Sequence, residues 1–347
     1  MAAVGGNRNA GLSVRRMLRI RLMMADSAYD LDLIRSALPD CDIEQWSDCR
    51  DWDAETLAAR CREVDAVVTG RNSPRLPDEL VTDRGRLRLL AHCHGTVKHL
   101  VSAQLVEAGL AVSNWGDNVY GVAEGALALL YACLKQIPQM DAFIKNDWSG
   151  DQWIGLTYPA TLVERDVGLY GCGPIGRHMA RILLPLGARV RAYDKYATEL
   201  PDGVEQVDSL TELFDRSQIV SIHCGLNDET KGSVDADCLA RLPKGGIVIN
   251  TARGGIIDED ALLKELQAKR LIAGLDVISD ERHWAQSPLN LPNAIFSGHK
   301  VASGRVDTSI EKKKKNLPKF VLTNLLALQT GESLQNLIPP AIFALKT

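Results

Sequence analysis

Short apolar runs alternate with amphipathic runs along most of the chain. A short run of aliphatic residues is typical of a strand inside a parallel sheet, and apolar residues three or four positions apart are typical of a helix on its face. In the first part of the chain one such helix is predicted between the first two strands, at 31–38. The strands predicted there are 18–24, 42–46, 65–70, 87–93 and 111–114. This alternation predicts a parallel sheet covered by helices.

A second series of the same kind follows a helix predicted at 122–137. The apolar run from Val122 to Leu134 contains Glu124 and is too short to cross a bilayer, so we expect a buried helix. The strands predicted after it are 166–171, 188–194, 218–224, 245–250, 271–278 and 294–297. The fold class is therefore α/β, with a second unit of the same architecture.

Composition narrows the class of protein. The 347 residues are 46% apolar and 24% charged, with a net charge of −4, which is ordinary for a soluble two-domain protein. A pI near 6.0 argues against nucleic acid as a partner. Eight cysteines without C-x-x-C spacing indicate reduced thiols in a cytoplasm, and residues 1–17 are predicted to be a disordered leader. His92 and His94 lack acidic or cysteine partners at metal-binding spacing, so no metal site is predicted.

A glycine-rich turn stands between the strand at 166–171 and a helical pattern. Gly171, Gly173 and Gly176 have the G-x-G-x-x-G spacing, with Pro174 and Ile175 between the last two. The first glycine permits a tight turn, the second lets the backbone approach a pyrophosphate, and the third allows close packing of helix on sheet. The alternative interpretation, a turn without a ligand, does not account for the strand and helix on either side. The segment predicts a dinucleotide site.

An acidic residue follows at the place where the adenosine ribose would bind. The next predicted strand ends at Asp194, 18 residues after Gly176. A carboxylate there accepts the ribose hydroxyls and repels a 2′-phosphate, so NAD is favoured over NADP. Lys195 weakens this preference, because a cation beside the carboxylate tolerates a phosphate.

Polar residues follow the last three predicted strands, at the edge of a parallel sheet where ligands bind. They are Arg253, Asp276 with Glu281, and His299. Reduction of a 2-keto acid needs a cation that holds the carboxylate and polarises the carbonyl, and an acid that delivers a proton. Arg253 and His299 suit these two tasks. Glu281 is the candidate to orient the imidazole and to favour its protonated form.

The order of these motifs resembles that of the D-isomer-specific 2-hydroxyacid dehydrogenase family, from about residue 65 to 310. The turn and the ribose aspartate are followed by an INTARGGIID segment (249–258), D-V-x-x-x-E (276–281) and SPL…LPN…H (287–299). The resemblance implies that Arg253 binds substrate, that Glu281 and His299 form the acid–base pair, and that Asp276 supports the nicotinamide carboxamide. It also implies that Thr251 and Ile175 line the cofactor cleft, and that backbone N–H groups of Gly95 and Thr96 hold the substrate carboxylate.

Some positions depart from the family pattern. Gly298 and Arg282 stand where the family commonly has proline, and Lys98 stands where aspartate is frequent. Lys98 together with Lys300 suggests a substrate with a second anionic group. The alternative is that both lysines point into water.

The resemblance also implies an architecture. Two Rossmann-like doubly wound domains would enclose an active-site cleft, with a discontinuous substrate domain (18–120 and 303–347) and an NAD-binding domain (121–302). A cytoplasmic homodimer acting on a small 2-hydroxy or 2-keto acid is expected, without membrane or nucleic acid partners. The same fold also serves NAD(H)-sensing corepressor-like proteins and enzymes that oxidise phosphite or formate. These alternatives stay open. Glu281 argues against formate oxidation, because the formate branch of the family carries an amide side chain as the partner of the histidine.

Overall fold

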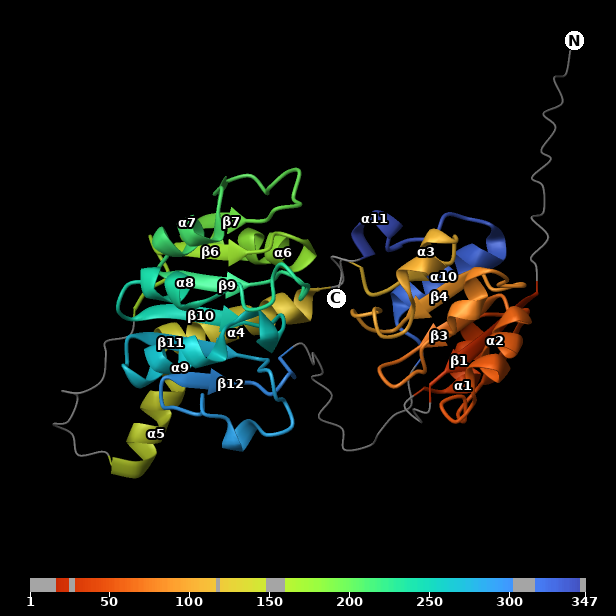
Figure 1. Ribbon diagram of the computed structural model, residues 1–347, viewed down its shortest axis with the longest axis horizontal. Helices are drawn as coiled ribbons and strands as arrows, with labels where there is room; N and C mark the ends of the chain where they lie inside the picture. The colour runs from red at the N-terminus through yellow and green to blue at the C-terminus, as the bar shows by residue number, and fades with distance from the viewer. Residues whose placement is uncertain (1–16, 25–28, 117–118, 148–159, 302–315, 344–347) are drawn as a thin grey trace, which may run out of the picture. The chain divides into compact units, whose positions relative to one another are not determined.

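The computed structural model describes residues 17–24, 29–116, 119–147, 160–301 and 316–343. The chain divides into unit 1, residues 1–116 and 308–347, and unit 2, residues 117–307. Each unit is a parallel sheet with helices packed against it (Figure 1). The α/β fold class predicted from the sequence is confirmed. The predicted leader lies outside the described residues apart from Met17.

Unit 1 contains a five-stranded sheet in the order β2-β1-β3-β4-β5. Its apolar strands separate two cores, one with α2, η1, α3 and α11, the other with α1 and α10. The loop after β4, at the carboxyl edge of the sheet, is the predicted substrate loop, where Gly95 and Thr96 are the residues expected to hold the substrate carboxylate. The elements of unit 1 are β1 (Leu18–Met23), α1 (Leu31–Ala37), β2 (Cys41–Gln45), α2 (Ala54–Arg62), β3 (Ala66–Thr69), η1 (Asp78–Val81), β4 (Leu89–His92), α3 (Ala103–Glu107), β5 (Ala111–Ser113), α10 (Lys319–Thr330) and α11 (Pro340–Phe343).

Unit 2 contains a seven-stranded sheet in the order β12-β11-β10-β9-β6-β7-β8. The chain runs outward from β6 in one direction and then returns to add β9 on its other side, so the strand order reverses between β6 and β9. Ligands of open parallel sheets bind at the carboxyl edge beside such a reversal. The strands are β6 (Asp166–Tyr170), β7 (Arg189–Tyr193), β8 (Val204–Gln206), β9 (Ile219–Ile222), β10 (Gly246–Asn250), β11 (Leu271–Leu275) and β12 (Ala294–Phe296).

The helices of unit 2 cover both faces of this sheet. Residues of α4 and α6 share one core with the strands, and residues of α7, α8 and α9 share the other. The predicted apolar helix is α4, and it ends where Gln136 adopts a left-handed φ of 52°. No helix of the described part of the chain is long and apolar enough to span a membrane. The helices are α4 (Tyr120–Lys135), α5 (Ile137–Asp147), α6 (Pro174–Leu183), α7 (Leu210–Asp215), α8 (Ala236–Arg241), η3 (Gly254–Ile256), α9 (Glu259–Gln267) and η4 (Trp284–Gln286).

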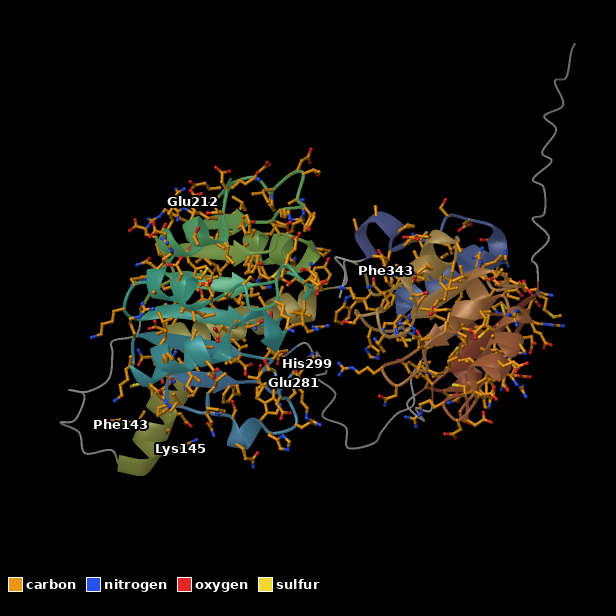
Figure 2. The ribbon with its side chains drawn as sticks, viewed as in Figure 1. Phe143, Lys145, Glu212, Glu281, His299 and Phe343 are labelled. Atoms are coloured by element: carbon orange, nitrogen blue, oxygen red, sulfur yellow. The ribbon has the colours of Figure 1, made fainter. Side chains whose placement is uncertain are left out.

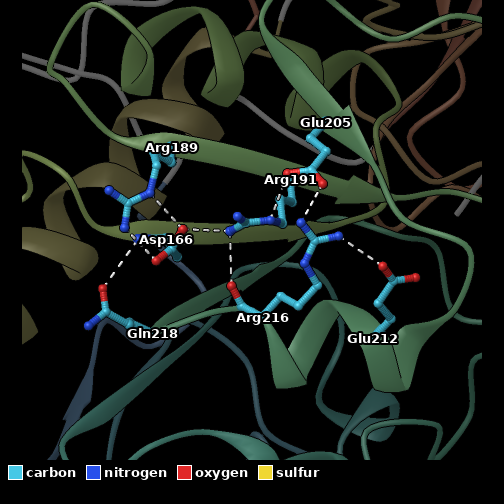
Figure 3. Close-up of polar contacts among 7 residues, drawn as sticks. All are labelled: Asp166, Arg189, Arg191, Glu205, Glu212, Arg216 and Gln218. Atoms are coloured by element: carbon cyan, nitrogen blue, oxygen red, sulfur yellow. Dashed lines mark hydrogen bonds and ion pairs between the residues drawn. The ribbon is translucent and has the colours of Figure 1, made fainter.

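An ion-pair network links the amino ends of the strands in unit 2 (Figure 3). Asp166, at the start of β6, accepts hydrogen bonds from Arg189 at 2.7 and 2.9 Å and from Arg191 at 2.6 Å. The hydrogen bonds from these two arginines hold the pKa of Asp166 well below its usual range. Arg191 in turn pairs with Glu205 of β8 at 2.9 Å. The network therefore fastens the edge strand β8, whose residues are mostly exposed.

Candidate active site

The glycine-rich turn between β6 and α6 is a backbone arrangement that side chains would disrupt. Gly171 has a φ of +95°, and a Cβ atom there would lie 2.5 Å from the amide nitrogen of Cys224. A Cβ atom at Gly176 would lie 2.2 Å from the carbonyl oxygen of Gly171. Gly173 differs, because nothing lies within 4 Å of its Cβ position, immediately before Pro174 at the start of α6. The turn thus leaves room in front of the positive end of a helix, where a pyrophosphate binds.

Asp194 connects this turn to the end of β7. Its Oδ2 accepts the amide of Cys172 at 2.6 Å, and its Oδ1 accepts the amides of Tyr196 at 2.9 Å and Ala197 at 3.1 Å. An ionised carboxylate offers about four lone-pair sites, so the half-buried side chain keeps capacity for a ribose hydroxyl. The predicted ribose ligand also anchors the glycine-rich turn, which sequence reasoning did not foresee.

Two side chains at strand ends of unit 2 have buried polar atoms that show no hydrogen-bond partner. They are Thr251, whose Oγ1 is buried after β10, and His223, both of whose ring nitrogens are buried. His223 follows β9 and its backbone lies against Gly171. Burial lowers the pKa of His223 to about 4, so the ring is neutral at neutral pH. Buried polar atoms of this kind normally have partners. Together with the open position at Gly173, they fit a polar ligand such as a dinucleotide.

Arg253 lies in the loop after β10. Contacts of Asn250 and of Gly254 fix the shape of this loop. The side chain of Asn250 accepts the amide of Ala252 at 3.0 Å and donates to the carbonyl of Arg253 at 2.9 Å. A Cβ atom at Gly254 would lie 2.1 Å from the carbonyl carbon of Ile278. The loops after β10 and β11 are therefore in direct backbone contact, and only a glycine fits between them. This contact brings the loop of Arg253 beside the loop of Asp276 and Glu281.

Asp276 fixes the loop that carries His299. Its Oδ1 accepts the Ser297 hydroxyl at 2.7 Å and the amides of Lys300 at 2.9 Å and Val301 at 3.1 Å. Its backbone carbonyl accepts the amide of His299 at 2.6 Å. The Asp276 side chain is 3% exposed, so these bonds are shielded from water. Asp276 thus holds the Ser297 side chain before the histidine and the backbone amides of residues 299–301, a role with no signal in the sequence pattern.

His299 contacts Glu281 directly. Its Nδ1 atom lies 2.7 Å from Oε2 of Glu281, and Figure 2 shows the two side chains side by side. Both side chains are partly exposed, at 39% and 36%. With Nδ1 on a carboxylate, Nε2 is the ring atom that can exchange a proton with a ligand. The pair predicted from the sequence is therefore present in unit 2.

The predicted substrate loop belongs to unit 1. Gly95 is buried, and a Cβ atom there would lie 2.5 Å from the indole of Trp115. The side-chain amide of Asn114 donates to the carbonyl of Gly95 at 2.6 Å. These contacts fix the backbone next to the half-buried Thr96. Asn114 and Trp115, which sequence reasoning missed, thus shape the segment after β4.

The arrangement of the glycine-rich turn, Asp194 and the histidine–glutamate pair agrees with sequence comparison. Residues 127–300 match the sequence model described as "D-isomer specific 2-hydroxyacid dehydrogenase, NAD binding domain". The chain belongs to the D-isomer-specific 2-hydroxyacid dehydrogenase family. Unit 2, which contains the matched residues, corresponds to the NAD-binding domain of this family.

Relatives in this family are about a third identical to the chain over the aligned residues. A D-3-phosphoglycerate dehydrogenase of Mycobacterium bovis is 32% identical over 258 residues, 72% of this chain and 48% of the relative. A hydroxypyruvate reductase of Thermotoga maritima is 32% identical over 249 residues, 70% and 79% of the two chains. A glyoxylate reductase structure from Paecilomyes thermophila shows the same fold, with a TM-score of 0.72 at 24% identity over 94% of this chain and 99% of that one. The chain spans about half the length of the curated phosphoglycerate dehydrogenases it matches.

Two departures from the family pattern have local structural reasons. Gly298 has a φ of +64°, which proline, locked near −65°, cannot adopt. Arg282 donates its amide to Asp280 at 3.2 Å, a bond that proline cannot make. Asp280 also contacts His283 at 2.8 Å, and the hydrogen bond from His283 is the main reason that the pKa of Asp280 falls to about 2. The loop before His299 is thus built from glycine and hydrogen-bonded side chains.

Proposed function

We propose that this protein is an NAD-dependent oxidoreductase that transfers a hydride between NAD(H) and the α-carbon of a small 2-hydroxy or 2-keto acid. The observation that carries the proposal is the 2.7 Å contact between Nδ1 of His299 and Glu281, on a domain with a glycine-rich dinucleotide turn. An imidazole that a carboxylate orients is suited to general acid–base chemistry. A family named for 2-hydroxyacid dehydrogenases supports the same reaction class.

Each polar side chain has a role in this reaction. During reduction, His299 donates the Nε2 proton to the carbonyl oxygen of the substrate, and Glu281 stabilises the imidazolium before the proton leaves. In the opposite direction, neutral His299 accepts the hydroxyl proton. The guanidinium of Arg253 binds the substrate carboxylate and polarises the carbonyl. The family resemblance assigns the backbone N–H groups of Gly95 and Thr96 to a substrate carboxylate as well.

The cofactor residues are the glycine-rich turn and the strand ends around it. Asp194 would accept a ribose hydroxyl, and Thr251 with Ile175 would line the cofactor cleft. Asp276 would support the carboxamide in addition to holding the His299 loop. When bound, the nicotinamide supplies or accepts the hydride. Gly171, Gly173, Pro174 and Gly176 would form the turn at the start of α6 that leaves room for the pyrophosphate.

The names of the relatives support a substrate with a carboxylate beside the reacting carbon. Hydroxypyruvate reductase and D-3-phosphoglycerate dehydrogenase both act, by their names, on acids of this kind. A substrate with a second anionic group remains a hypothesis that rests on Lys98 and Lys300. An NAD(H)-sensing protein and an enzyme for phosphite or formate are the alternatives on this fold.

We also propose that the protein is a cytoplasmic homodimer associating through unit 2, as the family resemblance implies. Apolar side chains on α5 support this interface, because Ile137 and Ile144 are 57% and 52% exposed. Sedimentation analysis of the purified protein should give twice the mass of the chain. A monomer at micromolar concentration would contradict the proposal.

The activity is tested by following NADH absorbance with a panel of 2-keto acids. The panel includes glyoxylate, hydroxypyruvate, pyruvate, oxaloacetate, branched acids and a phosphorylated acid. We expect NADH oxidation with at least one member of the panel. NADH binding without turnover of any acid would favour the sensing protein, and NAD reduction by phosphite alone would favour an inorganic substrate.

A further inference from the structure

A single lysine follows the carboxylate at the adenosine end of the proposed cofactor site. Asp194 comes immediately after β7, and Lys195 comes next. A 2′-phosphate carries about −1.5 to −2 charge near neutral pH. The carboxylate repels that phosphate, whereas an available lysine attracts it. A side chain that pairs with the Lys195 ammonium should therefore affect the affinity for NADP relative to NAD.

Glu229 binds this lysine and the residue after it. Its Oε1 lies 2.7 Å from Nζ of Lys195, and its Oε2 accepts the Tyr196 hydroxyl at 2.9 Å. Both carboxylate oxygens are thus engaged by two successive residues beyond β7. The hydrogen bond from Lys195 is the main cause that lowers the pKa of Glu229, and the bond to Glu229 is the main cause that raises the pKa of Lys195.

The turn that carries Glu229 is itself fixed. The side-chain oxygen of Asn227 accepts the amides of Glu229 and Thr230, both at 2.9 Å. The Thr230 hydroxyl accepts the Asn227 amide at 2.8 Å and contacts the carbonyl of Gly225 at 2.7 Å. This turn follows β9, which is separated from β7 by β6 in the sheet. Exposed ion pairs are usually weak because both side chains must be ordered. Here the carboxylate starts from an ordered turn and has two donors.

We propose that Glu229 is a specificity-determining residue, which discriminates against NADP by holding Lys195 in an ion pair beside the ribose site. This inference rests on the proposed function, because it assumes that the chain binds NAD. Asp194 supplies the direct repulsion of a 2′-phosphate. Glu229 engages Lys195, a neighbouring cation that would otherwise offset this repulsion.

The test measures binding of NAD⁺ and NADP⁺ separately by calorimetry, without substrate. In Glu229→Gln, we expect the affinity for NADP⁺ relative to NAD⁺ to rise about tenfold, since Lys195 becomes available to the phosphate. The gain should disappear in the double variant Glu229→Gln/Lys195→Gln. It should also shrink at high salt, because the lysine–phosphate contact is exposed.

Glu212→Gln is the matched control. Glu212 is a glutamate of α7 whose Oε1 lies 2.9 Å from a guanidinium nitrogen of Arg216. This ion pair belongs to the network at the amino ends of the strands (Figure 3). Asp194 follows the carboxyl end of β7, at the opposite edge of the sheet. The control should keep the wild-type ratio of the two affinities.

The inference is overturned if Glu229→Gln keeps the wild-type ratio, or if the gain persists after Lys195 is also replaced. Failure of the wild-type protein to bind either dinucleotide would contradict the proposed function itself. The two failures are distinguishable, because only the second affects the wild type.

Discussion

Nδ1 of His299 lies 2.7 Å from Oε2 of Glu281, although 18 positions separate the two residues in the chain. They meet because Glu281 follows β11, His299 follows β12, and these strands are neighbours in the sheet. Within the described residues, the pair is the acid–base candidate that both the sequence and the structure support.

Replacing Glu281 by Gln should lower turnover roughly 10- to 100-fold, because the neutral amide no longer stabilises the imidazolium. Steady-state kinetics with the best 2-keto acid measure the loss. Asp280→Asn is a matched control on the adjacent residue, whose carboxylate contacts Arg282 and His283 instead. Equal losses in the two variants would mean that loop disruption, not the pairing of Glu281 with His299, explains the effect.

The glycines of the turn should respond differently to alanine. Gly173→Ala meets no protein atom within 4 Å, so the protein should keep its melting temperature while NAD⁺ affinity falls at least about tenfold. Gly176→Ala places a Cβ 2.2 Å from a carbonyl oxygen, so its stability should fall by about 1–3 kcal/mol. Thermal unfolding and NAD⁺ titration of both variants check the contrast. Unchanged NAD⁺ affinity in Gly173→Ala would argue against a pyrophosphate at this position.

Asp276→Ala should destabilise the protein by about 1–3 kcal/mol, because buried donors around His299 lose their acceptor. Ser297→Ala removes one of the three donors to Oδ1 and should cost less. Urea unfolding gives the two free energies, and kinetics should show a larger loss of turnover for Asp276→Ala. A larger destabilisation by Ser297→Ala would refute the assigned role.

Stability should fall in acid because of His92. This side chain is 1% exposed, and burial, with the nearby charges of His94 and His99, lowers its pKa to about 3. The unfolded chain binds the proton near pH 6.5, whereas the native protein does not until about pH 3. Below pH 6.5 the unfolded state therefore binds more protons, and stability falls by up to about 1.4 kcal/mol per pH unit toward pH 3.

Urea midpoints between pH 7 and pH 4 measure this slope. His92→Asn retains a polar group where Nδ1 contacts the Thr69 hydroxyl at 3.0 Å, and it does not titrate. The variant should show a shallower dependence on pH, whatever its absolute stability. Parallel curves for the two proteins would exclude His92 as the cause.

Much of the fold follows from the sequence because most of the parallel strands are short runs rich in apolar and β-branched residues. Every strand predicted from such a run is present, with ends that differ by a few residues. The strand β8 was not predicted, since Val204–Gln206 is mostly exposed and is held by pairing with β7 and by the Glu205 ion pair. The strand predicted at 271–278 ends at Leu275, because the chain turns there into the loop that Asp276 organises.

The candidate site was predictable where residue type alone indicates chemistry, as for His299 and Arg253. The supporting contacts were not, because they join loops that are distant in the chain. Glu229 and Lys195 are 34 positions apart, and Asp276 contacts Val301 across 25. Neither pair has a periodic or motif signal, so only the three-dimensional structure identifies them.

The most direct test of the account compares wild-type protein with His299→Ala in two measurements, NADH binding by fluorescence and NADH oxidation with the best 2-keto acid. The account predicts that the variant binds NADH normally while its turnover falls by roughly 10²- to 10⁴-fold, the usual contribution of a general acid. Turnover by His299→Ala at the wild-type rate would contradict the assignment of this histidine and, with it, the proposed mechanism.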